Sequence, residues 1–285
     1  MSDIFIRDLN TIDEYRQVVD LEHTIWGYTD MADVVTVPVF IITMKRGAIL
    51  LGAFDGTRMV GFAWSIVGMK DGRPLQWSHM TGVLPEYRGG LGFNLKCAQR
   101  ERALARGYDL IEWTFDPLQA LNAHLNLAKL GAVVEEYAEN FYGESTSTLH
   151  RGTPTDRLIA HWMIREPHVV RRLQQTSVVA VRSHEVEGAP LVNPTAMTGG
   201  WRTMSKVDLA VDARRMWVEI PTGFTEMQQR APEVALQWRL QAREIFQAYF
   251  ARGYRAVDFV LQRERGFGRY LLARKDGESR MTNDE

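Results

Sequence analysis

The residues best suited to chemistry lie in a glycine-rich turn between a predicted strand and a predicted helix. The turn reads Val83-Leu84-Pro85-Glu86-Tyr87-Arg88-Gly89-Gly90-Leu91-Gly92-Phe93 and follows the β-rich stretch 75–83. Such a turn directs several backbone N–H groups at the positive end of a helix dipole, which stabilises a bound anion. Glycine fits here because a Cβ would keep a phosphate away from the backbone. The turn therefore predicts a site for the pyrophosphate of a cofactor, with a plain tight turn as the alternative.

Two common phosphate-binding motifs are absent from this turn, because it has neither Gly-x-Gly-x-x-Gly nor Gly-Lys-Ser/Thr. It instead resembles motif A of the GCN5-related N-acetyltransferase (GNAT) superfamily, roughly Val-x-Pro-x-x-Arg-Gly-x-Gly-x-Gly, which holds the pyrophosphate of acyl-CoA. The turn is one residue shorter before the last two glycines, so either Tyr87 or Arg88 takes the place of the first polar residue. The resemblance implies cofactor contacts from Thr81, Gly82, Val83, Tyr87, Arg88, Gly89, Gly90, Leu91, Gly92 and Phe93.

A second resemblance lies in Asn122-Ala123-His124-Leu125-Asn126-Leu127-Ala128-Lys129-Leu130-Gly131-Ala132, which is similar to GNAT motif B. Asn122, Asn126 and Lys129 follow the spacing i, i+4, i+7, which places them on one helix face. The resemblance directs this face at the pantetheine of the cofactor, and a solvated face is the alternative. The family often has a tyrosine four residues before the glycine, where this chain has Leu127.

The stretches 113–118, 122–132 and 140–143 together resemble one GNAT subgroup of long predicted acyltransferases, some of which acylate amino acids. The resemblance covers roughly residues 20–175. It implies acyl-CoA, as acetyl-CoA or succinyl-CoA, for the co-substrate and a small amine for the acceptor. The rival reading is a CoA-binding sensor or assembly module that has lost the chemistry, because the helix tyrosine is missing and the glycine turn is short.

Acyl transfer to an amine needs a polarised carbonyl, a neutral amine and a proton for the leaving thiolate. In the family the carbonyl lies between two strands that splay, here 75–83 and 110–115. Alternation places His79 on the same strand face as Thr81 and Val83, and an imidazole titrates near neutrality, so His79 is predicted as the base. Glu112 on the neighbouring strand is the alternative base or a partner for His79, and a purely structural histidine stays open.

The proton donor is predicted to be Tyr142, with Tyr137 and His124 as alternatives. No His, Cys and carboxylate cluster has metal-ligand spacing, so no metal is expected. No Gly-x-Ser-x-Gly elbow occurs either, and direct transfer without a covalent enzyme intermediate follows as the simplest mechanism.

The predicted strands and helices alternate along the first half, which indicates an α/β fold. Residues 1–150 are predicted to form a GNAT domain with a central twisted mixed sheet. Strands are expected at 4–6, 49–54, 59–67, 75–83, 110–115 and 132–137, and helices at 11–26, 91–106 and 117–130. Residues 151–176 are predicted as a linking helix. Residues 177–276 are predicted as a smaller GNAT-like C-terminal domain, and 277–285 as a flexible tail.

The C-terminal prediction rests on a faint repeat. Ala105-Arg106-Gly107-Tyr108 and Ala251-Arg252-Gly253-Tyr254 each precede a predicted strand, in which Glu112 and Asp258 fall at the same place. The stretch 222–224 carries only one glycine, so no cofactor is expected in this half. Chance similarity is the alternative. The half is expected to shape the acceptor pocket or to form a subunit contact.

Composition limits the remaining possibilities. Apolar content of 45% and charged content of 24% are typical of a soluble globular protein. The single cysteine, Cys97, excludes an internal disulfide and is typical of a reducing compartment, so a cytoplasmic protein without a signal sequence is expected. A net charge of −1 gives no general attraction to nucleic acid, and the apolar run 34–44 is too short to span a membrane. A small-molecule acceptor and a possible homodimer are the expected partners.

Overall fold

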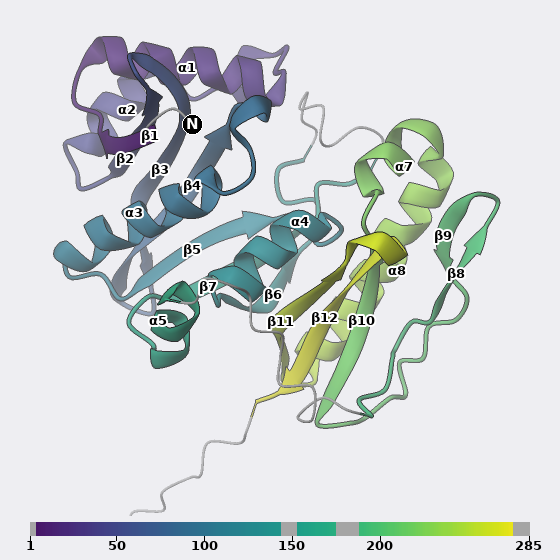
Figure 1. The fold of residues 1–285 in the computed structure, drawn as a ribbon. Helices are drawn as coiled ribbons and strands as arrows, with labels where there is room; N and C mark the ends of the chain where they lie inside the picture. Colours follow the sequence, from purple (N-terminus) through teal and green to yellow (C-terminus); the bar gives the residue numbers. More distant parts are fainter. Residues whose placement is uncertain (1–3, 144–152, 175–187, 276–285) are drawn as a thin grey trace, which may run out of the picture.

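The computed structural model describes residues 4–143, 153–174 and 188–275. Its centre is a ten-stranded sheet in the order β1-β2-β3-β4-β5-β7-β6-β11-β12-β10, with a separate hairpin of β8 and β9 (Figure 1). All neighbours in the large sheet are antiparallel except β4 and β5, which are parallel. The predicted mixed α/β class with a central mixed sheet is confirmed. The strands are β1 Ile4–Asp8, β2 Ile49–Asp55, β3 Arg58–Lys70, β4 Arg73–Val83, β5 Leu110–Phe115, β6 Val133–Ala138, β7 Arg157–Met163, β8 Thr195–Thr198, β9 Trp201–Met204, β10 Arg215–Pro221, β11 Tyr254–Gln262 and β12 Phe267–Arg274.

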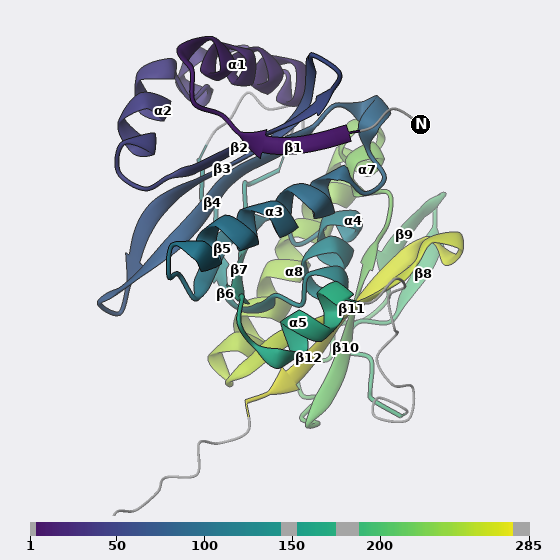
Figure 2. The ribbon, with the colours of Figure 1, turned by 60° about the vertical axis from the view of Figure 1, so that its left-hand side comes forward.

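Helices cover both faces of the sheet. In Figures 1 and 2, α3, α4 and α5 lie on one face and α8 lies on the other. A Cβ on Gly82 would come within 3.0 Å of Ile25 and Trp26 of α1, whereas one on the neighbouring-strand Gly61 would face Leu95 of α3, so α1 and α3 also cover opposite faces. The helices are α1 Ile12–Trp26, α2 Val37–Met44, α3 Leu91–Ala105, α4 Ala120–Ala123, α5 Pro167–Gln174, α7 Phe224–Arg230 and α8 Pro232–Ala251, with short turns η1 Met31–Asp33, η2 Pro85–Tyr87, η3 His124–Lys129 and η4 Arg263–Arg265.

The order of elements in the first half agrees with the predicted strands and helices, except that the helix α2 at Val37–Met44 was not predicted. Local signals explain several boundaries. Thr11 and Glu14 form a capping box at the start of α1, and Gly27 ends that helix in the left-handed conformation. Gly107 adopts a positive φ of 81° after α3, as expected for a helix C-terminal glycine.

The predicted linking helix at 151–176 is wrong over most of its described part. Arg157–Met163 is the strand β7, which lies between β5 and β6 and pairs with both, and only Pro167–Gln174 is helical. The segment Arg157–Met163 is buried along most of its length because it is a central strand with both faces covered. A short, continuous apolar run has neither the helical nor the strand period, so its pattern alone does not separate the two structures. The first domain therefore extends past residue 150.

The C-terminal half continues the same sheet instead of forming a separate one. β11 meets β6 through the pair Ala256 and Val134, and β12 and β10 follow outward. The repeat that was read from the sequence is visible locally, because Gly253 ends α8 with a φ of 80° just before β11. The predicted tail at 277–285 lies outside the described residues.

Within the described ranges, no single helix is long and apolar enough to span a membrane. Only the pair Ile12–Trp26 and Met31–Met44, bent by 113°, passes on length and composition together. The same ranges contain no group of three or more His, Cys, Asp or Glu residues arranged to hold a metal ion.

Candidate active site

The two parallel strands β4 and β5 separate after a short contact. They pair only at Gln76 with Ile111 and at Trp77 with Glu112, although β4 continues to Val83. The other edge of β4 stays paired with β3 up to Val83. Beyond Trp77, the β5-facing edge of β4 is therefore open, as predicted. The Thr81 hydroxyl is buried there and has no hydrogen-bond partner among the described residues, so an unsatisfied polar atom lies beside the opening.

The glycine turn lies at the end of this open strand and leads into α3. Gly90 is the N-cap of α3 and provides no side-chain cap, so the first N–H groups of the helix lack a side-chain acceptor. Gly89 has a φ of 121°, which favours glycine. A Cβ at Gly89, Gly90 or Gly92 would meet no atom within 4 Å, so the space beside the backbone is open. An open cradle of donors at a helix N-terminus fits the pyrophosphate of acyl-CoA.

The side chains around the turn have different roles. Arg88 is exposed and has no hydrogen-bond or ion-pair partner in the described part of the chain, so it can reach an anion in the cradle. Tyr87 donates its hydroxyl to Asp55 Oδ2 at 2.6 Å, so this side chain braces the turn against the β2–β3 hairpin and its hydroxyl does not face the cradle. Leu91 is buried in the core, and Phe93 packs against the core. Gly82 is needed because α1 packs directly on it.

A cavity of about 500 Å³ adjoins the opening on the face that α1 covers. Its walls come from the α1–α2 connection, the open part of β4, the end of β5, and α4, and they carry several groups that bind or transfer protons. These groups are Tyr28, Asp33, His79, Thr81, Thr114, Asp116, Asn122, Tyr142 and Arg157. The predicted base and the predicted acid therefore lie in one cavity, beside the predicted cofactor site.

His79 lines the cavity, but the predicted strand face is wrong. The register between β3 and β4 shifts between Trp64 and Ile66, opposite His79, which breaks the alternation. The His79 ring packs edge-on against Trp64 with a centroid distance of 5.4 Å, on the α2 side, whereas Val83 faces α3. Bulges of this kind redirect side chains near active sites. Desolvation lowers the pKa of His79, so the imidazole is neutral at neutral pH and able to accept a proton.

Glu112 shares the predicted face with Thr114, but the structure speaks against it as the base. Its carboxylate accepts from Lys70 Nζ at 2.7 Å and contacts His161 Nδ1 at 2.6 Å. Burial raises its pKa, yet the hydrogen bonds from His161 and Lys70 outweigh this effect and hold the pKa below the ordinary value. Glu112 also does not line the His79 cavity, so the predicted pairing with His79 is wrong and its partner is His161.

Tyr142 is the one candidate acid of the three that faces the cavity. Its hydroxyl lies 3.0 Å from Thr114 Oγ1, and the Arg157 guanidinium lies 5.3 Å from its ring centre. Tyr137 instead donates to Asp156 at 2.6 Å, and burial together with that carboxylate raises its pKa far above the ordinary value. His124 lies against β11, where burial and Lys129 lower its pKa. Tyr137 and His124 are therefore excluded as acids.

The predicted polar face of motif B is divided by the local helix geometry. Only Ala120–Ala123 is α-helical, and His124–Lys129 continues as a π-helix, which has more residues per turn. Asn122 is exposed and lines the cavity, whereas Asn126 is buried and Lys129 is partly buried. The spacing i, i+4, i+7 therefore does not define one face here, and Asn122 alone is placed to contact a ligand in this cavity.

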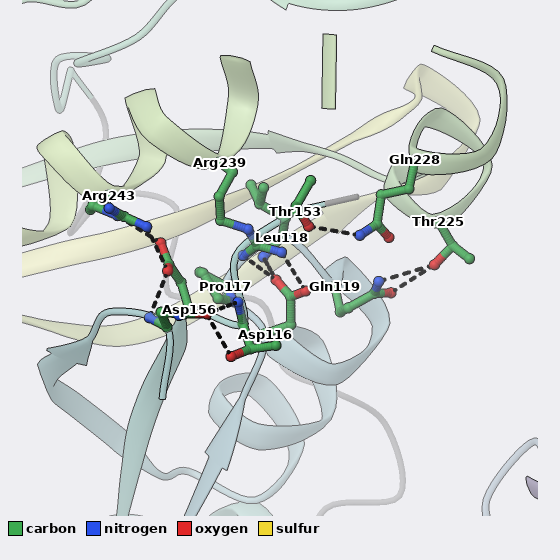
Figure 3. Close-up of polar contacts among 12 residues, drawn as sticks. Asp116, Pro117, Leu118, Gln119, Thr153, Asp156, Thr225, Gln228, Arg239 and Arg243 are labelled. Atoms are coloured by element: carbon green, nitrogen blue, oxygen red, sulfur yellow. Dashed lines mark hydrogen bonds and ion pairs between the residues drawn. The ribbon is translucent and has the colours of Figure 1, made fainter. Parts of the chain in front are cut away.

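Three charged residues of the cavity, Asp33, Asp116 and Arg157, were not identified as site residues from the sequence. Arg157 lies in the segment that was predicted as a linking helix, and Asp116 directly precedes the helix predicted at 117–130. Asp116 does accept a local hydrogen bond from Leu118 N at 2.8 Å, but both of its oxygens also bind Arg239 of α8, at 2.8 and 2.7 Å (Figure 3). The dipeptide Asp116-Pro117 is typical of a helix start, and no local pattern indicates that Asp116 also pairs with Arg239.

Helices α7 and α8 of the C-terminal half contact the end of β5 and the start of β7 (Figure 3). Arg243 of α8 binds both oxygens of Asp156, at 2.9 and 2.8 Å. Polar side chains extend this contact in two further pairs, Gln119 with Thr225 and Gln228 with Thr153. The C-terminal half thus supports the cavity from outside without lining it.

Known proteins give limited information. No family model and no curated protein matches the sequence. Among solved structures, the Escherichia coli ribosomal-protein-S18-alanine N-acetyltransferase is 18% identical, covers 57% of this chain and 96% of that chain, and has a TM-score of 0.46. A putative acetyltransferase from Salmonella typhimurium, solved with its cofactor acetyl-CoA, is 18% identical, covers 58% and 96%, and also has a TM-score of 0.46. A glucosamine N-acetyltransferase region of a fungal multi-domain β-N-acetylglucosaminidase is 20% identical, covers 40% of this chain and 14% of that chain, and has a TM-score of 0.33.

Proposed function

We propose that this chain is an acyl-CoA-dependent N-acyltransferase of the GNAT type, which transfers an acetyl or succinyl group directly to the primary amine of a small acceptor such as an amino acid. One observation carries the proposal. The open edge of β4 connects a glycine cradle at the start of α3 with a cavity that contains His79. A phosphate cradle and a proton acceptor at the two ends of one open strand are what acyl transfer from CoA requires.

Different residues of the chain bind different parts of the co-substrate. Gly89, Gly90 and Gly92 leave room for the pyrophosphate, with Arg88 beside them. The bound co-substrate supplies an activated acyl thioester. The unpaired Thr81 hydroxyl lies at the open edge of β4, where it can hydrogen-bond the acyl or pantetheine portion.

Proton transfer is assigned to two of the titratable side chains that line the cavity, His79 and Tyr142. His79, neutral because of its lowered pKa, accepts the proton of the acceptor ammonium and so generates the attacking amine. Tyr142 is the proposed donor of the proton that the leaving thiolate needs. Cys97 takes no part, since burial raises its pKa to about 11 and keeps it a thiol.

The acceptor is proposed to carry a negative group as well as an amine. Arg157 is 8% exposed and lines the cavity. A guanidinium remains charged at neutral pH and recognises a carboxylate through two parallel hydrogen bonds. The α-carboxylate of an amino acid fits this preference.

A thiol-release assay tests the proposal. Acetyl-CoA and succinyl-CoA are each incubated with a panel of amino acids, and free CoA thiol is measured over time. We expect release that depends on one of the amines and a product with an amide bond in mass spectrometry. Tight CoA binding without thiol release on any amine would support the rival function, a CoA-binding sensor or assembly module, which the missing tyrosine at Leu127 favours.

A further inference from the structure

Two opposite charges face the acceptor cavity, and the C-terminal half holds one of them. Asp116, at the end of β5, is 5% exposed and lines the cavity together with Arg157. Building on the proposed function, we propose that Asp116 binds the ammonium group of the acceptor and that Arg239 of α8 is the positioning residue that orients it. The C-terminal half then serves substrate recognition without touching the substrate.

The hydrogen bonds of Asp116 leave room for a ligand. Oδ1 accepts from Arg239 Nη1 and from Leu118 N, both at 2.8 Å, and Oδ2 accepts from Arg239 Nη2 at 2.7 Å. A carboxylate has about four acceptor positions in total. Oδ2 has one contact within the described ranges, so one acceptor position stays available for a donor in the cavity.

The charge state of Asp116 suits binding and not catalysis. Burial raises its pKa, but the attraction of Arg239 and its two hydrogen bonds outweigh burial and hold the pKa below the ordinary value. Asp116 therefore remains ionised at neutral pH and does not take a proton from the acceptor. His79, which desolvation keeps neutral by lowering its pKa, is left as the base, so one carboxylate binds the cation and one imidazole deprotonates it.

Asp116 and Arg157 together indicate the class of acceptor. Asp116 is the carboxylate whose charge acts most strongly on Arg157, so the two lie within electrostatic reach of each other. The cavity lining thus carries a carboxylate and a guanidinium that act on each other electrostatically. A small zwitterion with neighbouring ammonium and carboxylate groups, as in an α-amino acid, complements both charges.

A second ion pair on α8 provides the matched control. Arg243 lies one helical turn after Arg239 and binds Asp156 through both oxygens, and Asp156 is buried, as Asp116 is. Asp156 does not line the cavity. Both pairs attach α8 to the sheet through two hydrogen bonds, Asp116 at the end of β5 and Asp156 at the start of β7, but only Asp116 lines the cavity.

The test compares two double variants, Asp116→Asn/Arg239→Gln and Asp156→Asn/Arg243→Gln, in which neither partner is left as a buried unpaired charge. The KM values for the acceptor and for acyl-CoA are measured with the best amine of the thiol-release panel. In the first variant we expect the acceptor KM to rise about 10–100-fold, as for a lost hydrogen bond between charged groups, with the acyl-CoA KM unchanged. The second variant is expected to lose thermal stability but to keep both KM values.

Calorimetry supplies a readout that does not depend on turnover. Wild-type protein is expected to bind the amino acid more tightly than the matching α-hydroxy acid, and the Asp116→Asn/Arg239→Gln variant is expected to lose this preference. The single Arg239→Gln variant should bind the amino acid more weakly as the pH falls, at pH values where the wild type is constant, because Asp116 loses the charge that keeps it ionised. An equal rise of acceptor KM in both double variants, or an unchanged preference for the amine, would overturn the assignment. A third outcome separates the two proposals. If no amine is acylated, but wild type prefers the amino acid over the hydroxy acid and the Asp116→Asn/Arg239→Gln variant does not, the proposed acyl transfer is contradicted and the proposed ammonium site is supported.

Discussion

The sheet has two openings, and only one of them has the features of an active site. β4 and β5 separate after Trp77 and Glu112, and β6 and β11 touch only through Val134 and Ala256. The cavity that reaches the second opening is the larger, about 1070 Å³ against about 500 Å³ for the first, and it extends from β6 and β11 across β7 and β5 to the β3–β4 turn. The size of an opening therefore does not decide which one does chemistry.

The difference lies in what the neighbouring backbone and side chains offer. The first opening ends at a glycine cradle on α3, whereas the corresponding turn of the C-terminal half has only Gly223, with a φ of −104°, at the start of the seven-residue helix α7. The first cavity contains His79, which has no hydrogen-bond partner in the described part of the chain. At the second cavity, His161 is already bound to Glu112 and Lys70. The first opening is therefore the candidate site, because its backbone donors and its histidine are available to a ligand, whereas His161 at the second cavity is already ion-paired.

The largest expected effect is at His79, and His161 provides the control. His79→Gln should reduce kcat by about 10²–10⁴-fold, the usual range for loss of a general base, while CoA affinity stays near wild type. The rate of the wild type should fall on the acidic side as His79 becomes protonated, below the ordinary histidine pKa because desolvation lowers it. This limb should flatten in the variant. His161→Gln at the second opening should keep the wild-type kcat. A normal rate in folded His79→Gln would move the base elsewhere.

Two buried glutamates should respond with opposite signs. Glu22 of α1 is fully buried, accepts one hydrogen bond from Val35 N at 3.0 Å, and has its pKa raised by burial from 4.5 to about 7. A raised pKa in the folded state means that stability is lost as the pH rises from 4.5 to about 7. Relative to wild type, Glu22→Gln should therefore gain about 3 kcal/mol in free energy of unfolding over that interval.

Glu112→Gln provides the contrast, since Glu112 is bound to His161 of the second cavity. The pKa of Glu112 is lowered by its hydrogen bonds, so its contribution is present at neutral pH and is lost as the pH falls through the folded pKa. The substitution should lower the free energy of unfolding at pH 7 by about 1–3 kcal/mol. Urea unfolding at several pH values measures both variants. The same sign for both at pH 7 would contradict the assigned environments.

The smallest effect is expected at two exposed arginines. Arg88→Ala, beside the glycine cradle, should weaken CoA binding on the order of 10-fold, as for one charge-assisted contact. Arg73→Ala is the matched control, because Arg73 lines the second cavity. Equal CoA affinities of the two variants would show that Arg88 does not reach the cofactor.

Local patterns predicted much of this architecture and of the cofactor side. The glycine turn, the Thr11 cap and the opening between β4 and β5 follow from residues close together in the sequence, and the structure agrees with each. His79 was placed in the cavity for a partly wrong reason, since the register shift opposite it alters its face. Alternation cannot foresee a bulge, because an extra residue leaves no mark in the hydrophobic pattern.

The acceptor side depends on contacts that are distant in the sequence. Asp116 meets Arg239, 123 residues later, and Asp156 meets Arg243, 87 residues later. Neither pair has a local signature. Arg157 enters the cavity only because its segment is a strand and not the predicted helix. The sequence therefore indicated acyl transfer from CoA more clearly than it indicated the residues that bind the acceptor.

Titration calorimetry of CoA tests the central claim most directly. Gly92 and Gly223 are matched, because neither has a positive φ and a Cβ on either would meet no atom within 4 Å. We expect one CoA per wild-type chain, a loss of affinity on the order of 100-fold in Gly92→Val, where the new side chain occupies the phosphate cradle, and unchanged binding in Gly223→Val. Two equivalent sites per chain, or wild-type affinity in a folded Gly92→Val protein, would contradict the assignment of the cradle to CoA.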